Sequence, residues 1–150
     1  MVDDYEPWRR YVSTALQKIP KLEIVGEAID GLEGAQKAQE LQPDLVLLDI
    51  GLPQLNGIEA GRRIRELSPK SKILFISENR CWEITEKALG IGASGYLVKS
   101  AAAGELLPAV EAVLNDQRFV SASLLAMISP ALKAVRRHKR GYRTRQQPSL

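Results

Sequence analysis

The chain is constrained most by a short apolar run that ends in an acid. Residues 45–48 are LVLL and are followed directly by Asp49. A continuous apolar run of this length, bounded by turn-forming residues, is typical of a strand that is buried on both faces of a parallel sheet. Loops at the carboxyl ends of such strands collect ligands and chemistry, which makes Asp49 a candidate functional residue. The alternative is that Asp49 only caps the turn or helix that follows.

Length and composition favour one globular domain whose chemistry depends on carboxylates. The 150 residues are 45% hydrophobic and 26% charged, which is ordinary for a folded domain. No apolar run approaches the roughly 20 residues of a membrane span and no secretory signal follows Met1, so we expect a cytoplasmic location without membrane association. Cys81 and His138 are the only residues of their kinds, which excludes an intrachain disulfide and a cysteine metal site.

Helix and strand patterns alternate along the chain. Apolar residues at helical spacing alternate with short apolar runs, and this order is typical of a parallel sheet with helices on both faces. We therefore predict a doubly wound α/β fold. Pro108 requires the last predicted helix to start late, near Glu105, or to kink. The predicted helices cover residues 6–18, 30–41, 57–67, 80–89 and 103–114, and the predicted strands cover residues 22–27, 45–48, 72–76 and 96–98.

Polar side chains stand at the ends of separate predicted strands. The carboxyl ends of parallel strands meet at one edge of a sheet, so these side chains are expected to converge. Crowded carboxylates repel one another and need a divalent cation, and hard oxygen ligands suit Mg²⁺. A lysine and a hydroxyl could then contact a phosphoryl group that is held on a nucleophilic aspartate. The residues concerned are Asp3, Asp4, Asp49, Ser77 and Lys99.

Each of these residues also has a structural explanation when it is taken alone. Asp3 and Asp4 could cap the first helix, Ser77 could form a turn, and Lys99 could be a solvated lysine. Their joint placement at strand ends is what indicates a shared site.

These motifs resemble the CheY-like receiver domain of response regulators. The resemblance covers about residues 1–117 and implies a flavodoxin-like (βα)5 three-layer sandwich with a five-stranded sheet ordered 2-1-3-4-5. Residues 118–150 would form a linker or helical extension with a basic tail. Residues 95–100 (GYLVKS) resemble the NarL/FixJ, or LuxR-type, subclass. The matching motifs are residues 2–4 (VDD), 47–50 (LLDI), 52–53 (LP), 56–57 (NG), 76–77 (IS) and 92–99 (GASGYLVK).

The resemblance also implies a phosphoryl-accepting site in a two-component system. Asp49 would accept the phosphoryl group from a sensor histidine kinase, and Ser77 and Lys99 would bind its oxygens. The domain would then be a transcription-regulating switch and no enzyme beyond its own phosphorylation and dephosphorylation. Mg²⁺ would be held by Asp3, Asp4, Asp49 and the main-chain carbonyl of Gly51.

The resemblance also implies that Tyr96 is the switch residue. Its ring would turn inward when Ser77 moves toward the phosphoryl group, which would alter the face formed by residues 80–89, 96–98 and 103–114. That face would promote homodimerisation or the binding of another partner. The alternative for Tyr96 is a half-buried strand aromatic.

The chain departs from the family pattern at its start and at Glu78. It nearly lacks the family's central first strand, because the first predicted helix begins at about residue 6. We expect the true start to lie upstream of Met1; the alternatives are a gap filled by another segment or partner, or a distorted sheet. Glu78 stands where the family usually has a small or apolar residue, so we expect its charge to slow phosphotransfer.

The third departure is the end of the chain. After residue 118 the apolar spacing predicts one or two helical turns, and residues 136–145 are basic. The remaining length holds no helix-turn-helix pattern, so DNA binding by such a domain is not expected. The tail is expected to be a solvated terminus; weak contact with nucleic acid or an acidic partner is the alternative.

Two other functions remain open at this point. One is a pseudo-receiver that is not phosphorylated and acts as a binding module, which the short first strand and Glu78 favour. The other is a phosphatase with an aspartyl nucleophile. That chemistry generally needs a second acid two residues after the nucleophile, where this chain has Gly51.

Overall fold

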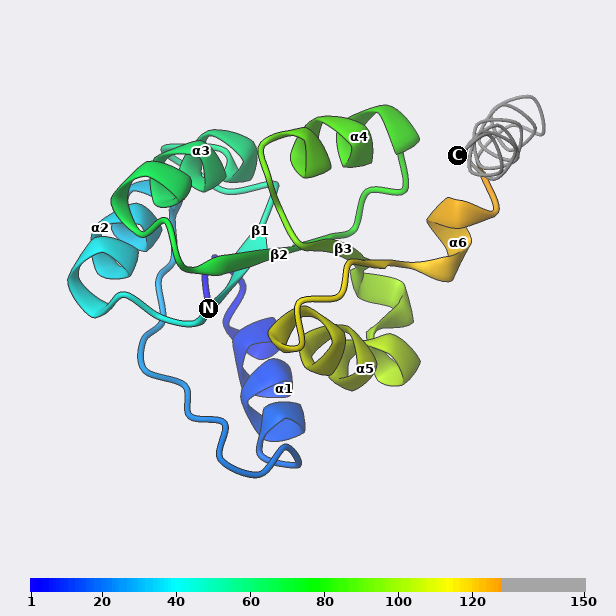
Figure 1. The fold of residues 1–150 in the computed structure, drawn as a ribbon, viewed down its shortest axis with the longest axis horizontal. Coiled ribbons are helices and arrows are strands. Elements are labelled where there is room, and N and C mark those ends of the chain that lie inside the picture. Colours follow the sequence, from blue (N-terminus) through cyan, green and yellow to red (C-terminus); the bar gives the residue numbers. More distant parts are fainter. Residues whose placement is uncertain (128–150) are drawn as a thin grey trace, which may run out of the picture.

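The computed structural model describes residues 1–127, which form a parallel sheet with helices on both faces (Figure 1). The expected doubly wound α/β fold is therefore confirmed. The four strands lie in the order β1-β2-β3-β4, and each neighbouring pair is parallel. They are β1 (Leu45–Asp49), β2 (Lys72–Ser77), β3 (Gly95–Val98) and β4 (Phe119–Val120).

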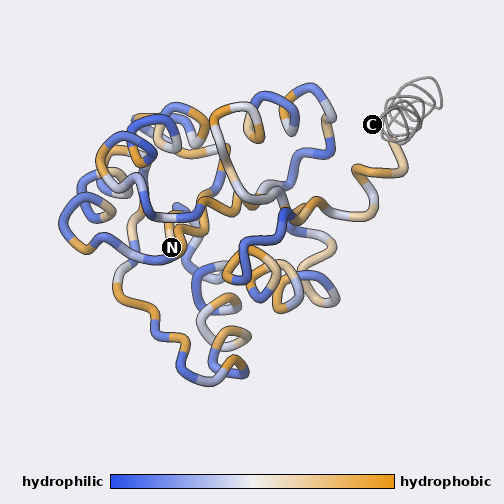
Figure 2. Tube along the Cα trace, in the orientation of Figure 1, coloured by the Kyte–Doolittle hydropathy of each residue, from blue (hydrophilic) through white to orange (hydrophobic). Residues whose placement is uncertain are grey.

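The helices divide between the two faces of the sheet (Figure 1). Helices α1 (Glu6–Leu16) and α5 (Ala102–Leu114) cover one face, with the short η1 (Lys99–Ala101) leading into α5. Helices α2 (Gly31–Leu41), α3 (Gly57–Leu67) and α4 (Trp82–Gly90) cover the other. Figure 2 shows hydrophilic and hydrophobic residues alternating around these helices, as expected for helices with one face on a core.

The strand register brings the carboxyl ends of the strands to one edge. Asp49 at the end of β1 is the partner of Ile76, and Ser77 at the end of β2 is the partner of Val98. Lys99 follows β3 directly. The polar residues that the sequence places at strand ends therefore share an edge.

The start of the chain joins the sheet through isolated bridges and not through a regular strand. Val2 forms isolated parallel bridges to Leu48 and to Ala28, so it lies between these two segments. The order Ala28, Val2, β1, β2, β3 is the expected 2-1-3-4-5 order, with its first two members reduced to single bridges.

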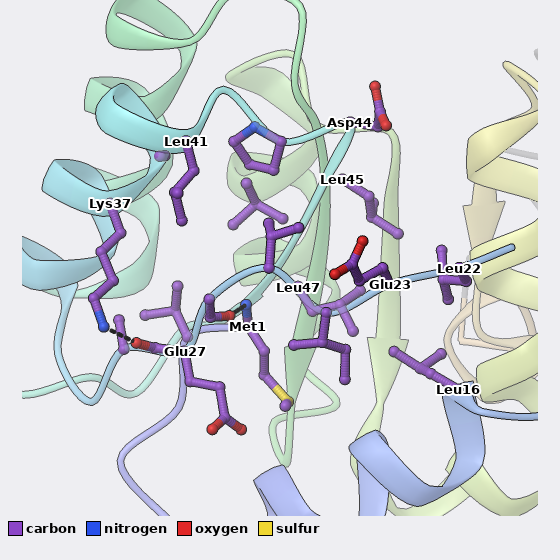
Figure 3. A pocket seen from close by; sticks show the side chains of 18 of the residues that line it. Met1, Leu16, Leu22, Glu23, Glu27, Lys37, Leu41, Asp44, Leu45 and Leu47 are labelled. Atoms are coloured by element: carbon purple, nitrogen blue, oxygen red, sulfur yellow. Dashed lines mark hydrogen bonds between the residues drawn. The ribbon is translucent and has the colours of Figure 1, made fainter.

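The prediction of a strand over residues 22–27 is wrong. These residues form no regular element, although the segment lies alongside β1 across a cavity (Figure 3). A strand exists only where a neighbouring strand accepts and donates its hydrogen bonds. The neighbour here reaches back only to Met1, whose ammonium donates to the Gly26 carbonyl at 3.0 Å.

Of the two alternatives for Pro108, helix α5 excludes the late start. The helix begins at Ala102, three residues before Glu105, and Pro108 lies in its interior. The proline removes the donor that the Gly104 carbonyl would use. Gly104 and Pro108 are both exposed, so water can replace that hydrogen bond. A buried apolar face then holds the helix on the sheet in spite of the proline.

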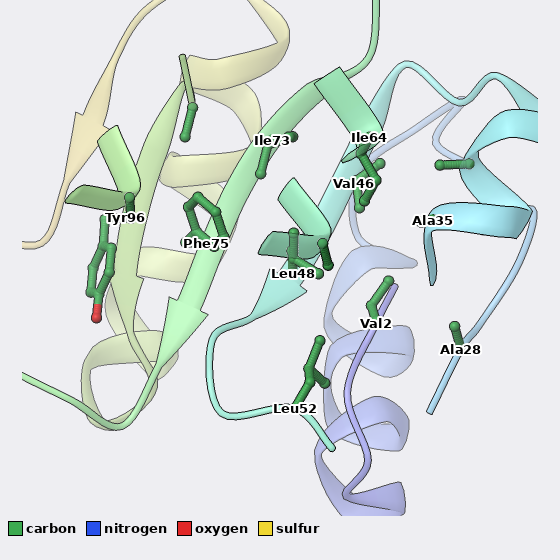
Figure 4. Packing of buried hydrophobic residues seen from close by; sticks show 14 of the residues in the cluster. Val2, Ala28, Ala35, Val46, Leu48, Leu52, Ile64, Ile73, Phe75 and Tyr96 are labelled. Atoms are coloured by element: carbon green, nitrogen blue, oxygen red, sulfur yellow. The ribbon is translucent and has the colours of Figure 1, made fainter. Parts of the chain in front are cut away.

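Residues just beyond the predicted domain limit at 117 pack against the same sheet. Strand β4 pairs with β3, and the Ser121 hydroxyl accepts a hydrogen bond from the Val98 amide at 2.8 Å. The short α6 (Ala122–Leu125) buries Leu124 in the core that lies under α2, α3 and α4, part of which Figure 4 shows. The basic tail of residues 136–150 lies outside the described residues.

Candidate functional site

Asp49 is held at the end of β1 by a tightly closed loop. The Gly57 amide donates to the Ile50 carbonyl at 2.8 Å, and Asn56 caps α3 by accepting from the Glu59 amide at 3.0 Å. A Cβ atom on Gly57 would lie only 2.0 Å from the Asp49 carbonyl oxygen, so this close approach requires glycine. Residues 50–56 therefore form a closed loop between Asp49 and the first residue of α3.

Three carboxylates meet at this edge. One oxygen from each of Asp3, Asp4 and Asp49 lies within 4.8 Å of the other two. Asp3 is 1% exposed and Asp49 is 8% exposed, whereas Asp4 is open to solvent. The Tyr5 amide donates to Asp3 Oδ1 at 2.8 Å, and the Gly51 amide donates to Asp49 Oδ1 at 3.2 Å. Main-chain donors thus orient the two buried carboxylates.

Lys99 supplies the positive charge that faces these carboxylates. Its Nζ lies 2.7 Å from Asp3 Oδ2 and 3.7 Å from Asp49 Oδ2. The Trp8 ring covers the same ammonium, with its centroid 5.1 Å from Nζ. Asp3 Oδ2 is buried, and the Lys99 ammonium is its close partner. Three carboxylates face this one ammonium, so the cluster keeps excess negative charge.

This donor set fits a divalent cation. Mg²⁺ prefers hard oxygen ligands and binds through one or two carboxylates while keeping several waters. Two buried carboxylates beside an exposed one supply both the ligands and access to solvent. The exposed Gly51, two residues after Asp49, lies beside the same cluster.

Burial raises the pKa of Asp49. The charges of Asp3 and Asp4 act in the same direction, while the Lys99 ammonium and the Gly51 amide act against it. The cause is desolvation, which disfavours the charged carboxylate. A cation bound at this edge would relieve the same cost.

Ser77 and Tyr96 are linked through the loop that follows β2. Ser77 Oγ accepts a hydrogen bond from the Asn79 amide at 3.0 Å, and the Tyr96 hydroxyl donates to the Asn79 carbonyl at 3.1 Å. The Tyr96 ring is fully buried, and burial raises the pKa of its hydroxyl, with the Ser77 and Thr85 hydroxyls acting in the opposite direction. Tyr96 is therefore an interior residue and not a half-buried one.

Comparison with known families decides what this arrangement is. Residues 1–111 match the response regulator receiver domain family. The chain belongs to that family. The fold and the polar residues at the strand ends, both of which the sequence predicts, agree with this assignment.

The receiver domain is similar to LuxR-family regulators. It is 39% identical over 121 residues to the transcriptional regulatory protein LiaR of Bacillus subtilis, covering 78% of this chain and 56% of LiaR. It is 33% identical over 136 residues to the nitrate/nitrite response regulator NarL of Escherichia coli, covering 91% of this chain and 63% of NarL. The chain thus spans about three fifths of the length of these relatives.

A solved structure shows the same fold. The crystal structure of a LuxR-family two-component response regulator from Aurantimonas sp. SI85-9A1 superposes with a TM-score of 0.82 at 34% identity. The match covers 89% of this chain and 94% of that one. The NarL-like subclass that residues 95–100 indicate is consistent with these neighbours.

The sequence did not single out Asn79 and Trp8 as site residues of the receiver domain. Asn79 accepts from the Cys81 amide at 2.7 Å through its side chain, in addition to its two main-chain contacts with Ser77 and Tyr96. Asparagine after a strand is an ordinary turn former, so its type alone gave no signal. Trp8 read as a core position of the first helix, and only the fold places it over Lys99.

Glu78 lies on the outer side of the receiver domain's site. It is exposed, and it lines a cavity of about 550 Å³ together with Trp8, Lys99 and Arg80. The Arg80 guanidinium donates to the Ser100 hydroxyl at 2.8 Å. Within the described residues, no helix is both long and apolar enough to cross a membrane.

Proposed function

We propose that this receiver domain is a phosphorylation-dependent switch in a cytoplasmic two-component system. Asp49 would accept a phosphoryl group from a phosphohistidine of a sensor histidine kinase. The observation that carries the proposal is the cluster at the strand ends, where Asp3, Asp4 and Asp49 lie within 4.8 Å and Lys99 reaches two of them.

The chemistry follows from the residues present. An Asp49 carboxylate oxygen attacks phosphorus while the bond from phosphorus to the histidine nitrogen breaks, which leaves an acyl phosphate on Asp49 and neutral histidine on the kinase. The Lys99 ammonium and the Ser77 hydroxyl would bind the transferred oxygens. Mg²⁺, when bound, would supply charge neutralisation for the phosphoryl group. Asp3, Asp4, Asp49 and the Gly51 carbonyl would hold it.

The link between Ser77 and Tyr96 offers a route from the site to the surface. Movement of Ser77 toward the phosphoryl group would disturb the Asn79 loop that also holds the Tyr96 hydroxyl. Tyr96 lies in β3, which runs between α4 and α5, so the change would emerge on the face made by these three elements. That face would mediate homodimerisation or the binding of another partner. Weak contact with nucleic acid would depend on the basic tail, which lies outside the described residues.

Incubation with acetyl phosphate and Mg²⁺, followed by intact-mass measurement, tests the proposal. One adduct of about 80 Da on the native chain, and none on Asp49→Asn or after chelation of Mg²⁺, supports it. No adduct at any donor concentration would support a pseudo-receiver that only binds partners. Continuous phosphate release from many esters would support the phosphatase instead.

A further inference from the structure

Trp8 lies in the first turn of α1, beside the carboxylate cluster. Its amide donates to the Tyr5 carbonyl at 3.1 Å, and the Arg9 guanidinium donates to the Asp3 carbonyl at 2.8 Å. The start of the helix is thereby tied to the main chain of Asp3. The Trp8 ring also packs on the core that contains Val12. Trp8 therefore has a fixed position relative to the site.

The Trp8 ring covers one side of the Lys99 ammonium. Lys99 Nζ lies 5.1 Å from the ring centroid, inside the roughly 6 Å over which an aromatic face attracts a cation. The Lys99 side chain is only 13% exposed, so water screens this attraction little. The Tyr11 ring lies against the indole at a centroid distance of 5.4 Å and an angle of 33°, which restricts rotation of the indole.

Other partners are available to the Lys99 ammonium at the mouth of the site. Glu78 is exposed and lines the same cavity as Trp8 and Lys99. A lysine has a flexible stem and a strongly hydrated charge, so water and Glu78 are both alternatives to the site. Among residues 1–127, however, the carboxylates that pair with Lys99 are those of Asp3 and Asp49. The indole lies where it favours this choice.

The distances show that Lys99 needs only a small movement to serve Asp49. Its Nζ lies 2.7 Å from Asp3 Oδ2 and 3.7 Å from Asp49 Oδ2, so a shift of about 1 Å brings it as close to Asp49 as it now is to Asp3. Even if that whole shift led away from the ring, the ammonium would stay near the limit of the aromatic contact. The indole can therefore hold Lys99 in both positions.

We propose that Trp8 is a positioning residue for phosphotransfer, and that its ring confines the Lys99 ammonium to the space between Asp3 and Asp49. This inference rests on the function proposed above and adds a residue to it. A lysine that is already aimed at Asp49 loses less side-chain entropy when the phosphoryl group arrives, so its charge is ready to stabilise the transferred oxygens. Trp8 acts through Lys99 and not on the phosphoryl group itself.

The test measures the initial rate of adduct formation on Asp49 of the full chain with acetyl phosphate and Mg²⁺. Trp8→Leu keeps an apolar side chain on the core but removes the aromatic face, and we expect the rate to fall by about fivefold to tenfold. Trp8→Phe keeps an aromatic face and should stay within about twofold of the native rate. Equal rates in Trp8→Leu and in the native chain would overturn the proposal.

Tyr5 offers a matched control. It is exposed and lines the same cavity, so Tyr5→Leu removes an aromatic ring from the mouth of the site but leaves the ring over Lys99 in place. We expect Tyr5→Leu to keep the native rate. A loss as large as that of Trp8→Leu would show that the contact between Trp8 and Lys99 is not the cause, and would overturn the proposal.

A double-mutant cycle separates positioning from support of the fold. A Lys99→Met chain has no ammonium to confine, so adding Trp8→Leu should change its residual rate by less than about twofold. The same fivefold to tenfold loss in that background would show that Trp8 acts without Lys99, and would overturn the proposal.

NMR observes the position of Lys99 directly. Protons over an aromatic face resonate upfield, so the ε-methylene signals of Lys99, assigned by their absence in Lys99→Met, should lie upfield of those of the other lysines. They should return to the ordinary position in Trp8→Leu and stay displaced after phosphorylation. Ordinary positions in the native chain would overturn the inference. No adduct on the native chain would defeat the proposed function and this inference together, whereas an adduct that forms equally fast in Trp8→Leu would defeat this inference alone.

Discussion

The Lys99 ammonium lies 2.7 Å from Asp3 Oδ2 but 3.7 Å from Asp49 Oδ2, so the lysine pairs more closely with Asp3 than with the proposed phosphoacceptor. This preference places the cation where Mg²⁺ is proposed to bind. A metal ion at Asp3 would release Lys99 to face Asp49. The proposal therefore implies that Mg²⁺ and the Lys99 ammonium compete for Asp3.

Removal of the lysine charge should destabilise the domain in the absence of Mg²⁺. Lys99→Met leaves the buried carboxylates of Asp3 and Asp49 without their cation, and we expect a loss of about 2–4 kcal/mol in the free energy of unfolding. Asp3→Asn added to Lys99→Met should recover most of that loss. Urea unfolding in EDTA measures both.

A matched lysine controls for the substitution itself. Lys87 is exposed on α4, and Lys87→Met should change the free energy of unfolding by less than about 0.5 kcal/mol. An equal loss in Lys99→Met and in the double variant would show that the Lys99 pairing with Asp3 does not matter.

The raised pKa of Asp49 predicts a pH-dependent effect of Asp49→Asn. A carboxyl whose pKa is higher in the folded chain contributes most below its unfolded pKa, and this contribution is lost as the pH rises through the folded value. In EDTA, Asp49→Asn should therefore be more stable than the native chain at pH 7, and the difference should shrink toward pH 4. Saturating Mg²⁺ should also reduce it. A difference that is independent of pH would contradict this account.

Tyr96→Phe should separate phosphorylation from its output. The substitution removes the hydroxyl that donates to the Asn79 carbonyl and interacts with the Ser77 and Thr85 hydroxyls, so we expect a cost of about 0.5–1.5 kcal/mol in the free energy of unfolding. The mass adduct with acetyl phosphate should form as in the native chain, while the shift in oligomeric state on phosphorylation, measured by sedimentation velocity, should weaken. Tyr11→Phe, on the exposed side of α1, serves as the control. Loss of the adduct itself would place Tyr96 in the phosphoryl-accepting site instead.

The strand ends of the site were predictable from the sequence because parallel strands share a direction. Apolar runs that end in Asp49, Ser77 and Lys99 can converge only at the carboxyl edge, and the register confirms this. Contacts that depend on loop geometry were not predictable. The Asn79 main chain joins Ser77 to Tyr96 through a turn that the residue types do not specify.

The missed strand over residues 22–27 has a different cause. Its residues favour a strand, but local preference is insufficient where the only main-chain partner within the described residues is Met1, which binds the Gly26 carbonyl. A late start of α5, one of the two alternatives for Pro108, is excluded for the opposite reason: packing of the apolar face of the helix outweighs the loss of one hydrogen bond at Pro108.

Glu78→Ala should accelerate phosphorylation. The Glu78 carboxylate is exposed beside Lys99 at the mouth of the site and repels an anionic donor, so its removal should raise the initial rate with acetyl phosphate by about twofold to fivefold at low salt. Glu86→Ala, which removes an exposed charge from α4, should leave the rate unchanged. The gain should fade as salt is added, and no gain at low salt would exclude a braking role for Glu78.

A crystal structure of the chain with Mg²⁺ and beryllium fluoride, a phosphoryl mimic, tests the central claim most directly. We predict beryllium fluoride on Asp49 and the ion held by Asp3, Asp4, Asp49 and the Gly51 carbonyl. Lys99 and Ser77 should contact fluorine atoms, with the ion pair between Lys99 and Asp3 broken. An ion and fluoride bound elsewhere, with Lys99 still paired to Asp3, would contradict the account.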